Sequence, residues 1–536
     1  MKRGLLLLAA AALASFGVAC GGGGSNGVAP TPMGGFTNAS LKGTYAFSMS
    51  GEGATINDFG LPISRIGSFV ADGNGNITAA LEDLTDAGNS TGAIGFSGGT
   101  YSIQANGKGT LTLNSSATSG LQLNIVMTSA SSGFLIQTDL LATSSGTFSL
   151  QSPGSFTQTA INGGYVFSVN GIDANLAPVS VVGQISTSGG GSVTSGVLDE
   201  NDGSSPAPSG AVAVAPGGSY QLDATAGHGT TFGRGTISFG GLAFAFYIVD
   251  GTHIFLMEED GVFATNGDAF QQSGTIATTN AGFTGNFVHV IGSGSLATGG
   301  PIGRGARYTA DGQGNLTSIG ADDNNAGLFS CIGAGDSRCT LQAAPSTYAI
   351  DTANAPTGRG TLKIAVTGQA NPFQGVFYLI SPTKAVIQDT SANAIGSGML
   401  MAQSGTFSNS SLAGNYTFNL SGIVLGTTSQ TSFFEEDFIG QYALSSAAAS
   451  NVTGAADFVE LGSSTSRPPA FLNVPITGTL KINGDGTQRN GFNIITGNSP
   501  STTLNFTAYI ASPQEIFLVG TDNTRVTNGT MTQQTQ

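Results

Sequence analysis

The feature that most constrains this 536-residue chain is an internal repeat, because one opening pattern occurs four times. The pattern is an apolar residue, any residue, Gly, any residue and then an aromatic residue. Its copies are Leu41-Lys42-Gly43-Thr44-Tyr45-Ala46-Phe47, Ile161-Asn162-Gly163-Gly164-Tyr165-Val166-Phe167, Phe283-Thr284-Gly285-Asn286-Phe287-Val288-His289 and Leu412-Ala413-Gly414-Asn415-Tyr416-Thr417-Phe418. Each copy marks the start of a repeated unit.

A closing pattern recurs in step with the opening one. It is a small polar residue and Gly, with Gln five places after the Gly, and it runs from Ser145 to Gln151, Asn266 to Gln272, Ser397 to Gln403 and Asn528 to Gln534. A third marker lies between them, at Asn76-Ile77-Thr78, Ser192-Val193-Thr194, Asn315-Leu316-Thr317 and Asn451-Val452-Thr453. The period of about 120 to 130 residues is a domain length. The markers therefore predict four tandem domains at 40–151, 160–272, 282–403 and 411–534.

The connections between these domains are short. They lie near 152–159, 273–281 and 404–410 and are rich in Ser, Thr and Gly. Such linkers predict a string of separate domains with limited freedom of movement.

Within one unit the hydrophobic pattern has the period of a β-strand. Tyr45, Phe47 and Met49 occupy alternate positions, and small or polar residues lie between them. Strands are expected near 43–50, 65–71, 76–83, 99–104, 109–114, 121–129, 133–138 and 146–151. Eight antiparallel strands joined by short hairpins favour an all-β, up-and-down barrel in each unit, with the last strand pairing with the first. A two-sheet β-sandwich would show the same alternation and stays open as the alternative.

The first 19 residues have the form of an export signal. Lys2 and Arg3 precede an apolar stretch, from Leu5 to Leu13, that is too short to span a bilayer comfortably. The segment ends in Gly17-Val18-Ala19-Cys20, followed by Gly21-Gly22-Gly23-Gly24-Ser25. This end resembles the lipobox of bacterial lipoproteins. The resemblance implies that Cys20 is acylated and becomes the mature N-terminus, that 20–39 form a Gly/Ser-rich tether, and that the protein is sorted to the outer membrane, since residue 21 is not Asp. A plain secretory signal with an incidental Cys is the alternative.

The cysteines and the net charge limit the covalent links and the partners that the chain is expected to have. Apart from Cys20, the chain has only Cys331 and Cys339, which are expected to form a disulfide in an oxidising compartment. Sixteen basic against 31 acidic residues give a net charge of -15, which argues against nucleic acid as a partner.

Two short motifs match the sequence patterns of known sites but lack features that those sites need. Gly95-Phe96-Ser97-Gly98-Gly99 fits the hydrolase pattern Gly-x-Ser-x-Gly, but a strand rather than a helix is expected after it. The segments from Asp72 to Asn76 and from Asp311 to Asn315 look like the start of a calcium loop. Because the Gly that such a loop needs at its sixth position is missing, a hairpin turn is favoured at both places.

Each unit also has acidic residues after its third marker, at Glu82-Asp83, Asp199-Glu200, Asp322-Asp323 and Asp457. Adjacent residues in a strand point to opposite faces, so these carboxylates are interpreted as solvated rim residues rather than as a catalytic pair. His289 replaces the Phe of the opening pattern and is expected inside its barrel, whereas His228 and His253 have no evident partners. No catalytic, cofactor-binding or metal-binding set is predicted.

In layout the units resemble lipocalin and avidin barrels, and the whole resembles exported bacterial lipoproteins made of tandem β-repeats. The predicted function is that of an exported, lipid-anchored envelope protein with a non-catalytic structural, binding or adhesive role and an unidentified surface partner. The first alternative is a carrier of small apolar ligands inside lipocalin-like barrels. An exported hydrolase is the last alternative, and no cofactor is expected.

Overall fold

The computed structural model describes residues 35–535, apart from short gaps at 116–119, 174, 206–208, 262, 298, 334–336, 369–372, 406, 426–432, 447–449, 463–467, 485–487 and 500. It is an all-β protein of four tandem, closed antiparallel barrels, so the predicted fold class is confirmed and the sandwich alternative is excluded. We call these units barrels 1 to 4 in chain order.

The elements of the four barrels follow one scheme. Barrel 1 contains η1 (Asn38–Ser40), β1 (Lys42–Gly53), β2 (Pro62–Asp72), β3 (Asn76–Asp86), β4 (Asn89–Phe96), β5 (Gly99–Ile103), β6 (Lys108–Leu113), β7 (Leu121–Ser129), β8 (Ser132–Gln137) and β9 (Ala142–Leu150). Barrel 2 contains η2 (Pro153–Ser155), η3 (Gln158–Ala160), β10 (Asn162–Asp173), β11 (Pro178–Ser188), β12 (Ser192–Asp202), β13 (Ser209–Val214), β14 (Gly218–Leu222), α1 (His228–Phe232), β15 (Arg234–Phe239), β16 (Leu242–Asp250), β17 (His253–Glu258) and β18 (Phe263–Gln271).

The second half of the chain repeats this order. Barrel 3 contains η4 (Asn280–Gly282), β19 (Thr284–Ser295), β20 (Pro301–Asp311), β21 (Asn315–Asn325), β22 (Leu328–Ile332), β23 (Ser346–Ile350), η5 (Ala355–Thr357), β24 (Arg359–Ile364), β25 (Phe373–Ser381), β26 (Lys384–Asp389) and β27 (Ala394–Ala402). Barrel 4 contains β28 (Gly414–Leu425), β29 (Phe433–Leu444), β30 (Ser450–Glu460), β31 (Phe471–Lys481), β32 (Asn490–Thr496), β33 (Thr503–Ser512), β34 (Glu515–Gly520) and β35 (Arg525–Gln533).

Each barrel closes because its last strand pairs with its first, as in β9 with β1. The third strand of barrel 1 is shared, since β3 pairs with β5 through its first residues and with β4 through the rest. The strand β4 at Asn89–Phe96 was not predicted, because its first residues are polar and lack an alternating pattern. In barrel 4 one strand, β31, spans both pairing regions.

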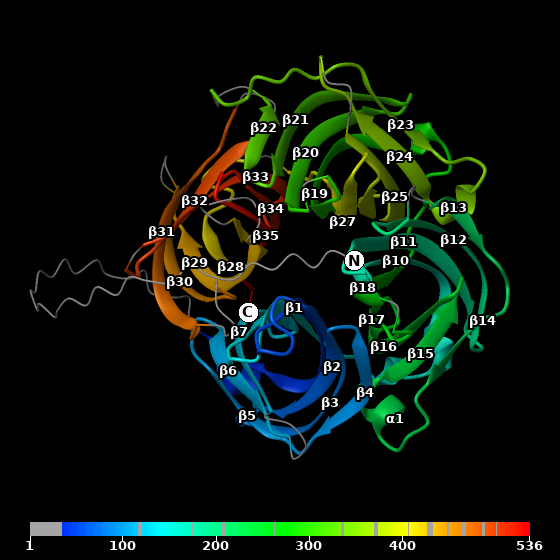
Figure 1. Cartoon of the computed structure of the whole chain (residues 1–536), viewed down its shortest axis with the longest axis vertical. Coiled ribbons are helices and arrows are strands. Elements are labelled where there is room, and N and C mark those ends of the chain that lie inside the picture. Colours follow the sequence, from blue (N-terminus) through cyan, green and yellow to red (C-terminus); the bar gives the residue numbers. More distant parts are fainter. Residues whose placement is uncertain are drawn as a thin grey trace, which may run out of the picture.

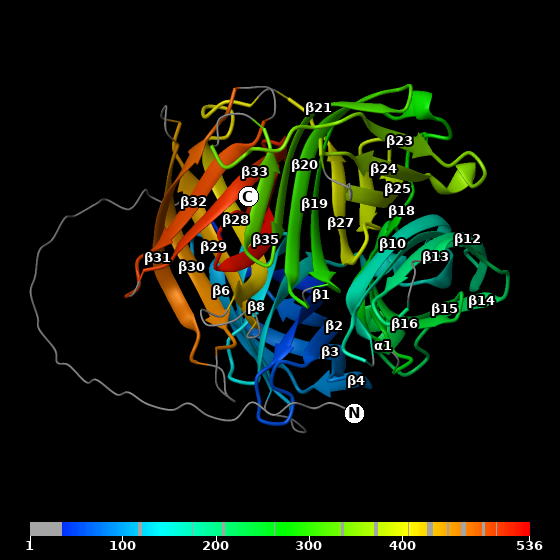
Figure 2. The same cartoon turned by 45° about the horizontal axis from the view of Figure 1, so that its top comes forward.

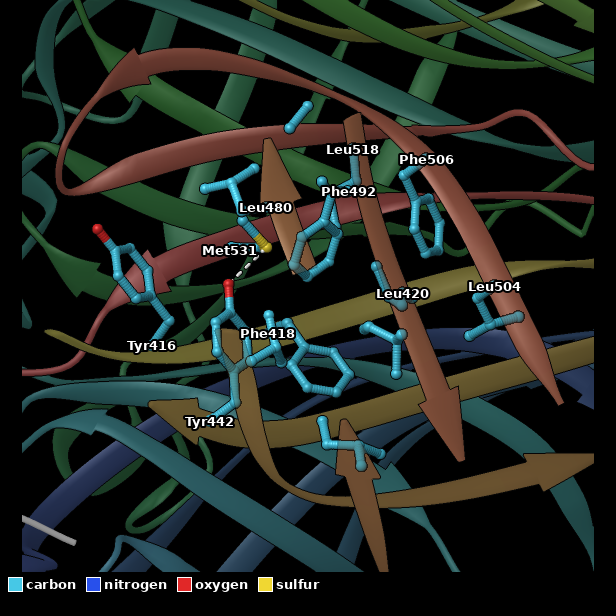
Figure 3. Packing of buried hydrophobic residues seen from close by; sticks show 14 of the residues in the cluster. Tyr416, Phe418, Leu420, Tyr442, Leu480, Phe492, Leu504, Phe506, Leu518 and Met531 are labelled. Atoms are coloured by element: carbon cyan, nitrogen blue, oxygen red, sulfur yellow. Dashed lines mark hydrogen bonds between the residues drawn. The ribbon is translucent and has the colours of Figure 1, made fainter. Parts of the chain in front are cut away.

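The barrel interiors are packed with apolar side chains. In barrel 4, Tyr416, Phe418 and Leu420 of β28 meet inward-facing residues of the other strands, including Phe492 and Met531 (Figure 3). The alternating positions that the sequence assigns to one face of the first strand are thus the ones that face the core.

One end of barrel 1 is closed by the chain that leads into it. Phe36 and Leu41 belong to the core, and the Tyr101 hydroxyl donates a hydrogen bond to the Leu41 carbonyl oxygen at 2.8 Å. The same tie joins Tyr220 to Ile161 in barrel 2 and Tyr348 to Phe283 in barrel 3. We call the opposite end, where β1 leads into β2, the mouth of the barrel.

The four barrels surround a common centre in chain order, and barrel 4 returns to contact barrel 1 (Figures 1 and 2). An apolar cluster lies between each neighbouring pair; Ile66 and Leu81 of barrel 1, for example, pack on Tyr247 and Phe255 of barrel 2. The short linkers were predicted correctly, but the expectation of separate domains was wrong. The barrels form one ring because their outer faces are apolar where they meet.

Among the described residues, no helix is both long enough and apolar enough to cross a membrane.

Candidate functional site

A buried ion pair lies at each contact between barrels, which we call a joint and number by its barrels. At joint 2–3, Asp199 at the outer face of β12 accepts hydrogen bonds from Arg359 Nε and from the Tyr378 hydroxyl, at 2.8 and 2.6 Å. The hydrogen bond to Asp199 raises the pKa of Arg359, and burial together with the Asp199 charge raises that of Tyr378. The carboxylate, guanidinium and phenol therefore form one buried hydrogen-bonded cluster with little access to water.

An equivalent set of an acid, a cation and a further hydrogen-bond donor recurs at the other joints. Its members are Asp83, Arg234 and Tyr247 at joint 1–2, Asp322, Arg489 and Tyr509 at joint 3–4, and Asp457, Lys108 and Asn124 at joint 4–1. Each acid comes from the third strand of one barrel, and each cation comes from the next barrel in the chain, with barrel 1 following barrel 4. The ring thus closes by the same chemistry that joins its consecutive barrels.

In three barrels a shift in strand pairing supplies a backbone N–H as a further hydrogen-bond donor to the buried acid. Opposite Asp83 the pairing of β3 with β4 shifts, and Ala93, which has a φ of 55°, donates its backbone N–H to the carboxylate at 3.0 Å. Ala211 does the same for Asp199, and Asn473 donates to Asp457. In barrel 3, Asp322 pairs without a shift opposite Cys331, which is joined to Cys339 by a disulfide, and Arg489 Nη1 contacts Cys339 Sγ at 2.8 Å.

The Gln of each closing pattern is a second link across the joints. Gln151 Nε2 donates to the carbonyl oxygens of Phe232 and Ile248 in barrel 2, and Gln272 Nε2 to those of Thr357 and Leu379 in barrel 3. Gln403 Nε2 donates to the Ile510 carbonyl oxygen in barrel 4. Gln534 Nε2 donates to the carbonyl oxygens of Asn106 and Met127 in barrel 1. The residue after each Gln adds a backbone hydrogen bond to the same neighbour.

The small polar residue of the closing pattern points to the preceding barrel instead. Asn266 Nδ2 donates to Ser48 Oγ at 3.0 Å, and the Ser145 hydroxyl donates to Asp437 at 2.8 Å. Ser397 bonds to Ser168 of barrel 2. The closing pattern therefore joins barrels 1 to 3 to both of their neighbours, a part that its use as a repeat marker did not predict.

The interpretation of the acidic residues in the third strands was wrong. Asp83, Asp199, Asp322 and Asp457 are not solvated rim residues, since each is at least 97% buried. Their neighbours Glu82 and Asp323 lie inside the barrels, where Glu82 meets Arg65 at 2.8 Å and Asp323 meets Arg304 at 3.0 Å. The two residues of each pair do point to opposite faces, as expected, but the outer face is covered by another barrel.

A cavity of about 380 Å³ lies where barrels 1 and 2 meet β29 of barrel 4. Glu52, Asn170, Asn266 and Glu435 are among its lining residues. Burial and repulsion by Asp437 raise the pKa of Glu52 to about 7 and that of Glu435 well above its usual range. Glu52 is therefore partly protonated near neutral pH.

The mouth of barrel 1 contains a larger cavity, of about 470 Å³. Arg65, Glu82 and Asp86 form its polar side, and the apolar residues Ile94, Phe96 and Leu121 also line it. Arg65 is 92% buried and Glu82 is 97% buried. Burial raises the pKa of Glu82 against the opposing effect of Arg65, and burial with repulsion by Asp58 raises that of Asp86.

Barrel 3 has a smaller cavity, of about 80 Å³, lined by His289, Arg304 and Phe373 among others. His289 faces the interior, as predicted; it is 99% buried, and burial lowers its pKa to about 3. A neutral imidazole next to Tyr308 is therefore part of this core.

The other candidates of the sequence have structural partners. Ser97 lies between β4 and β5, and its hydroxyl donates to the Asn114 carbonyl oxygen at 3.1 Å. Asp72 accepts the backbone amides of Asn74 and Asn76 in the hairpin between β2 and β3, so the turn interpretation is supported. The copy at Asp311 has the same hydrogen bonds.

The two remaining histidines were wrongly described as lacking partners. His228 Nδ1 lies 2.9 Å from Asp223, which also bonds to Arg234 of joint 1–2. His253 Nε2 lies 2.7 Å from Asp268 and stacks on Phe270.

In the described ranges, no group of three or more His, Cys, Asp and Glu side chains is arranged to hold a metal ion. Cys20, the export signal and residues 20–34 of the tether lie outside the described residues.

Comparison with known proteins leaves the chain without a family. No family model matches it, and no curated protein matches its sequence. Solved structures that share some similarity include kievitone hydratase from Nectria haematococca (8% identity, 46% of this chain and 90% of that chain, TM-score 0.19). Transferrin binding protein B from Haemophilus parasuis Hp5 aligns with 8% identity over 76% of this chain and 84% of that chain, with a TM-score of 0.20. The same protein from serogroup B Neisseria meningitidis aligns with 10% identity over 75% of this chain and 82% of that chain, with a TM-score of 0.18. TM-scores this low support no conclusion about fold or function.

Proposed function

We propose that this protein is an exported, lipid-anchored component of the bacterial cell envelope that acts without catalysis, as a rigid scaffold for binding. The observation that carries the proposal is the set of four equivalent joints, each with a buried ion pair and a Gln link. A chain that uses its recurring polar residues to fix four barrels in a ring is organised for a constant shape.

The N-terminal sequence supports the location. The export signal and the Cys20 lipobox resemblance imply acylation, and the following Gly/Ser-rich segment supplies a tether between the lipid and the ring. The ring presents four barrels to a surface partner, and binding through several barrels at once would raise the overall affinity.

The interior of barrel 4 gives no support to the alternative of a carrier for small apolar ligands, since its inward Phe, Tyr and Met side chains contact one another (Figure 3). The cavities of barrels 1 and 3 contain charged side chains, which do not suit a purely apolar ligand.

The anchor is tested by expressing the full chain and its Cys20→Ser variant in a bacterial host that processes lipoproteins. We expect the wild-type protein in the outer-membrane fraction, with a mature N-terminus at Cys20 that carries the mass of attached acyl chains. The Cys20→Ser variant should be recovered in the soluble periplasmic fraction. A wild-type protein that is cleaved elsewhere, or that is soluble without lipid, would contradict the proposal.

A further inference from the structure

We infer that the mouth of barrel 1 is a binding site for a small amphipathic organic cation, an amine with a neighbouring carbonyl or hydroxyl oxygen. The site is the cavity of about 470 Å³ described above, and nothing in the proposed scaffold function requires it.

The polar side of this cavity presents hydrogen-bonding atoms that nothing in the described protein satisfies. Arg65 Nε, Glu82 Oε2 and Asp86 Oδ1 are buried without a hydrogen-bond partner among the described residues. The Arg65–Glu82 ion pair uses Arg65 Nη1 and Glu82 Oε1, so the second oxygen of Glu82 stays available. A buried polar atom without a partner costs about 1 to 3 kcal/mol, which a ligand that bonds to it can recover.

The charge of the site selects the sign of the ligand. Three carboxyl groups line the cavity, from Asp58, Glu82 and Asp86, against the single guanidinium of Arg65. Glu82 Oε2 and Asp86 Oδ1 are each an acceptor for an ammonium group, and a cation at this place also offsets the repulsion between Asp86 and Asp58. The remaining Arg65 Nε donor requires an acceptor on the ligand, which accounts for the neighbouring oxygen.

The rest of the lining is apolar and fixes the other half of the ligand. Ile63, Leu84, Ile94, Phe96 and Leu121 contribute side chains to the same cavity. A ligand with a compact hydrocarbon body gains from burial against these residues.

Within this polar side Glu82 is specific to barrel 1, whereas Arg65 has a counterpart in Arg304 of barrel 3, and Asp86 has counterparts in Asp202 of barrel 2 and Glu460 of barrel 4. The strand registers place Val181 and Leu198 of barrel 2 where barrel 1 has Arg65 and Glu82. Barrel 4 has Phe438 and Ala456 at these positions. Interior positions that are apolar in two sister barrels are charged in barrel 1, so neither the fold nor the joints require the charges.

The test is calorimetric titration of the mature ring with three probes: phenylalaninamide, phenethylamine and 3-phenylpropanamide. At about pH 6.5 the amino groups are charged. Phenylalaninamide should bind best, phenethylamine should bind more weakly because it lacks the acceptor, and 3-phenylpropanamide should bind weakest because it lacks the ammonium.

Two variants and a matched control locate the site. Glu82→Gln and Asp86→Asn should each weaken phenylalaninamide binding by about tenfold or more. The second variant leaves the Arg65–Glu82 pair intact, so it reports on binding even if the first one destabilises barrel 1. Glu200→Gln removes one carboxyl from barrel 2 and should leave the affinity unchanged. Absence of binding up to about 10 mM, equal binding of the three probes, or an unchanged affinity in Asp86→Asn would each overturn the inference.

Discussion

At the scale of the residue, the neighbours Glu82 and Asp83 show how one strand serves two environments. Glu82 points into barrel 1 and pairs with Arg65, whereas Asp83 points outward and pairs with Arg234 of barrel 2. The sequence predicts the opposite orientations from the strand period alone. It does not predict that both sides are buried, because burial of the outer side depends on a residue about 150 positions away.

Removing one partner of a joint should therefore be costly. Asp199→Ala removes the buried carboxylate that Arg359 and Tyr378 share and leaves the guanidinium paired with Asp351 alone, and we expect a loss of about 3 kcal/mol in the free energy of unfolding. Urea denaturation, followed by circular dichroism, measures this loss. The neighbouring variant Glu200→Ala removes a carboxyl that faces the interior of barrel 2, and it should cost much less. Equal losses in both variants would contradict the role given to the joint.

A second prediction at this scale concerns pH. Glu258 lies inside barrel 2, where burial, followed by repulsion from Asp260, raises its pKa from 4.5 to about 8. The unfolded chain releases this proton near pH 4.5, and the folded protein holds it until about pH 8. The contribution of Glu258 to stability is therefore greatest below pH 4.5, falls as the pH rises, and is constant above pH 8.

The size of this change follows from the shift in pKa, at about 1.4 kcal/mol for each pKa unit, and amounts to about 5 kcal/mol. Stability curves at several pH values should show that Glu258→Gln loses less stability between pH 4.5 and 8 than the wild type. Parallel curves for the two proteins would show that Glu258 titrates normally.

At the scale of the element, β16 of barrel 2 shows why the ring was missed. In β16 the residues from Leu242 to Val249 are apolar without interruption. Alternate members face the core of barrel 2, whereas Ala245, Tyr247 and Val249 pack on barrel 1. A continuous apolar run is typical of a strand that is buried on both faces. This run was the available signal for contacts between barrels.

The closing pattern allows a matched test at this scale. Gln272→Leu removes the two hydrogen bonds to barrel 3 and leaves the Thr357 and Leu379 carbonyl oxygens without this donor, so we expect a loss of about 1 to 3 kcal/mol. Hydrogen exchange should become faster in β25, next to joint 2–3, and stay slow in β33 of barrel 4.

The adjacent Gln271 supplies the control. Its Nε2 bonds to the Asn162 carbonyl oxygen within barrel 2, at an exposed position. Gln271→Leu should leave exchange at the joint unchanged, and a similar effect of both variants would argue against the link.

At the scale of the whole molecule, closure of the ring depends on joint 4–1. Lys108 and Asn124 of barrel 1 hold Asp457 of barrel 4, and Gln534 reaches the Met127 carbonyl oxygen. The other joints have Arg and Tyr where this joint has Lys and Asn. Because Lys offers a point charge in place of the planar fork of Arg, joint 4–1 has the simplest polar set of the four.

The closed ring has a measurable size in solution. A compact chain of about 500 residues has a radius of gyration of about 23 Å. Small-angle X-ray scattering of the mature protein should give a value near this one. Lys108→Glu places two acids together at joint 4–1 and should increase the radius, whereas Lys363→Glu, on β24 of barrel 3, should not. An unchanged radius in Lys108→Glu would show that joint 4–1 does not hold the ring closed.

The sequence by itself determined the local order of this protein. Four repeats, period-two alternation and turn residues such as Asp72 specify eight of the strands in barrel 1 and the number of barrels, because strand formation and hairpin turns depend on neighbouring residues. The pair Cys331 and Cys339 also lies close in sequence, and the structure joins them.

Only the tertiary structure decided what the outer faces of the barrels contact. The polar partners of Asp199, Gln272 and Asn266 belong to other barrels, and no local pattern states which one. The unpartnered atoms at the mouth of barrel 1 were equally hidden, since they depend on how β2, β3, β4 and β7 surround a space. Long-range contacts of this kind are set by packing between distant segments, and a linear pattern records only that a face is apolar or charged.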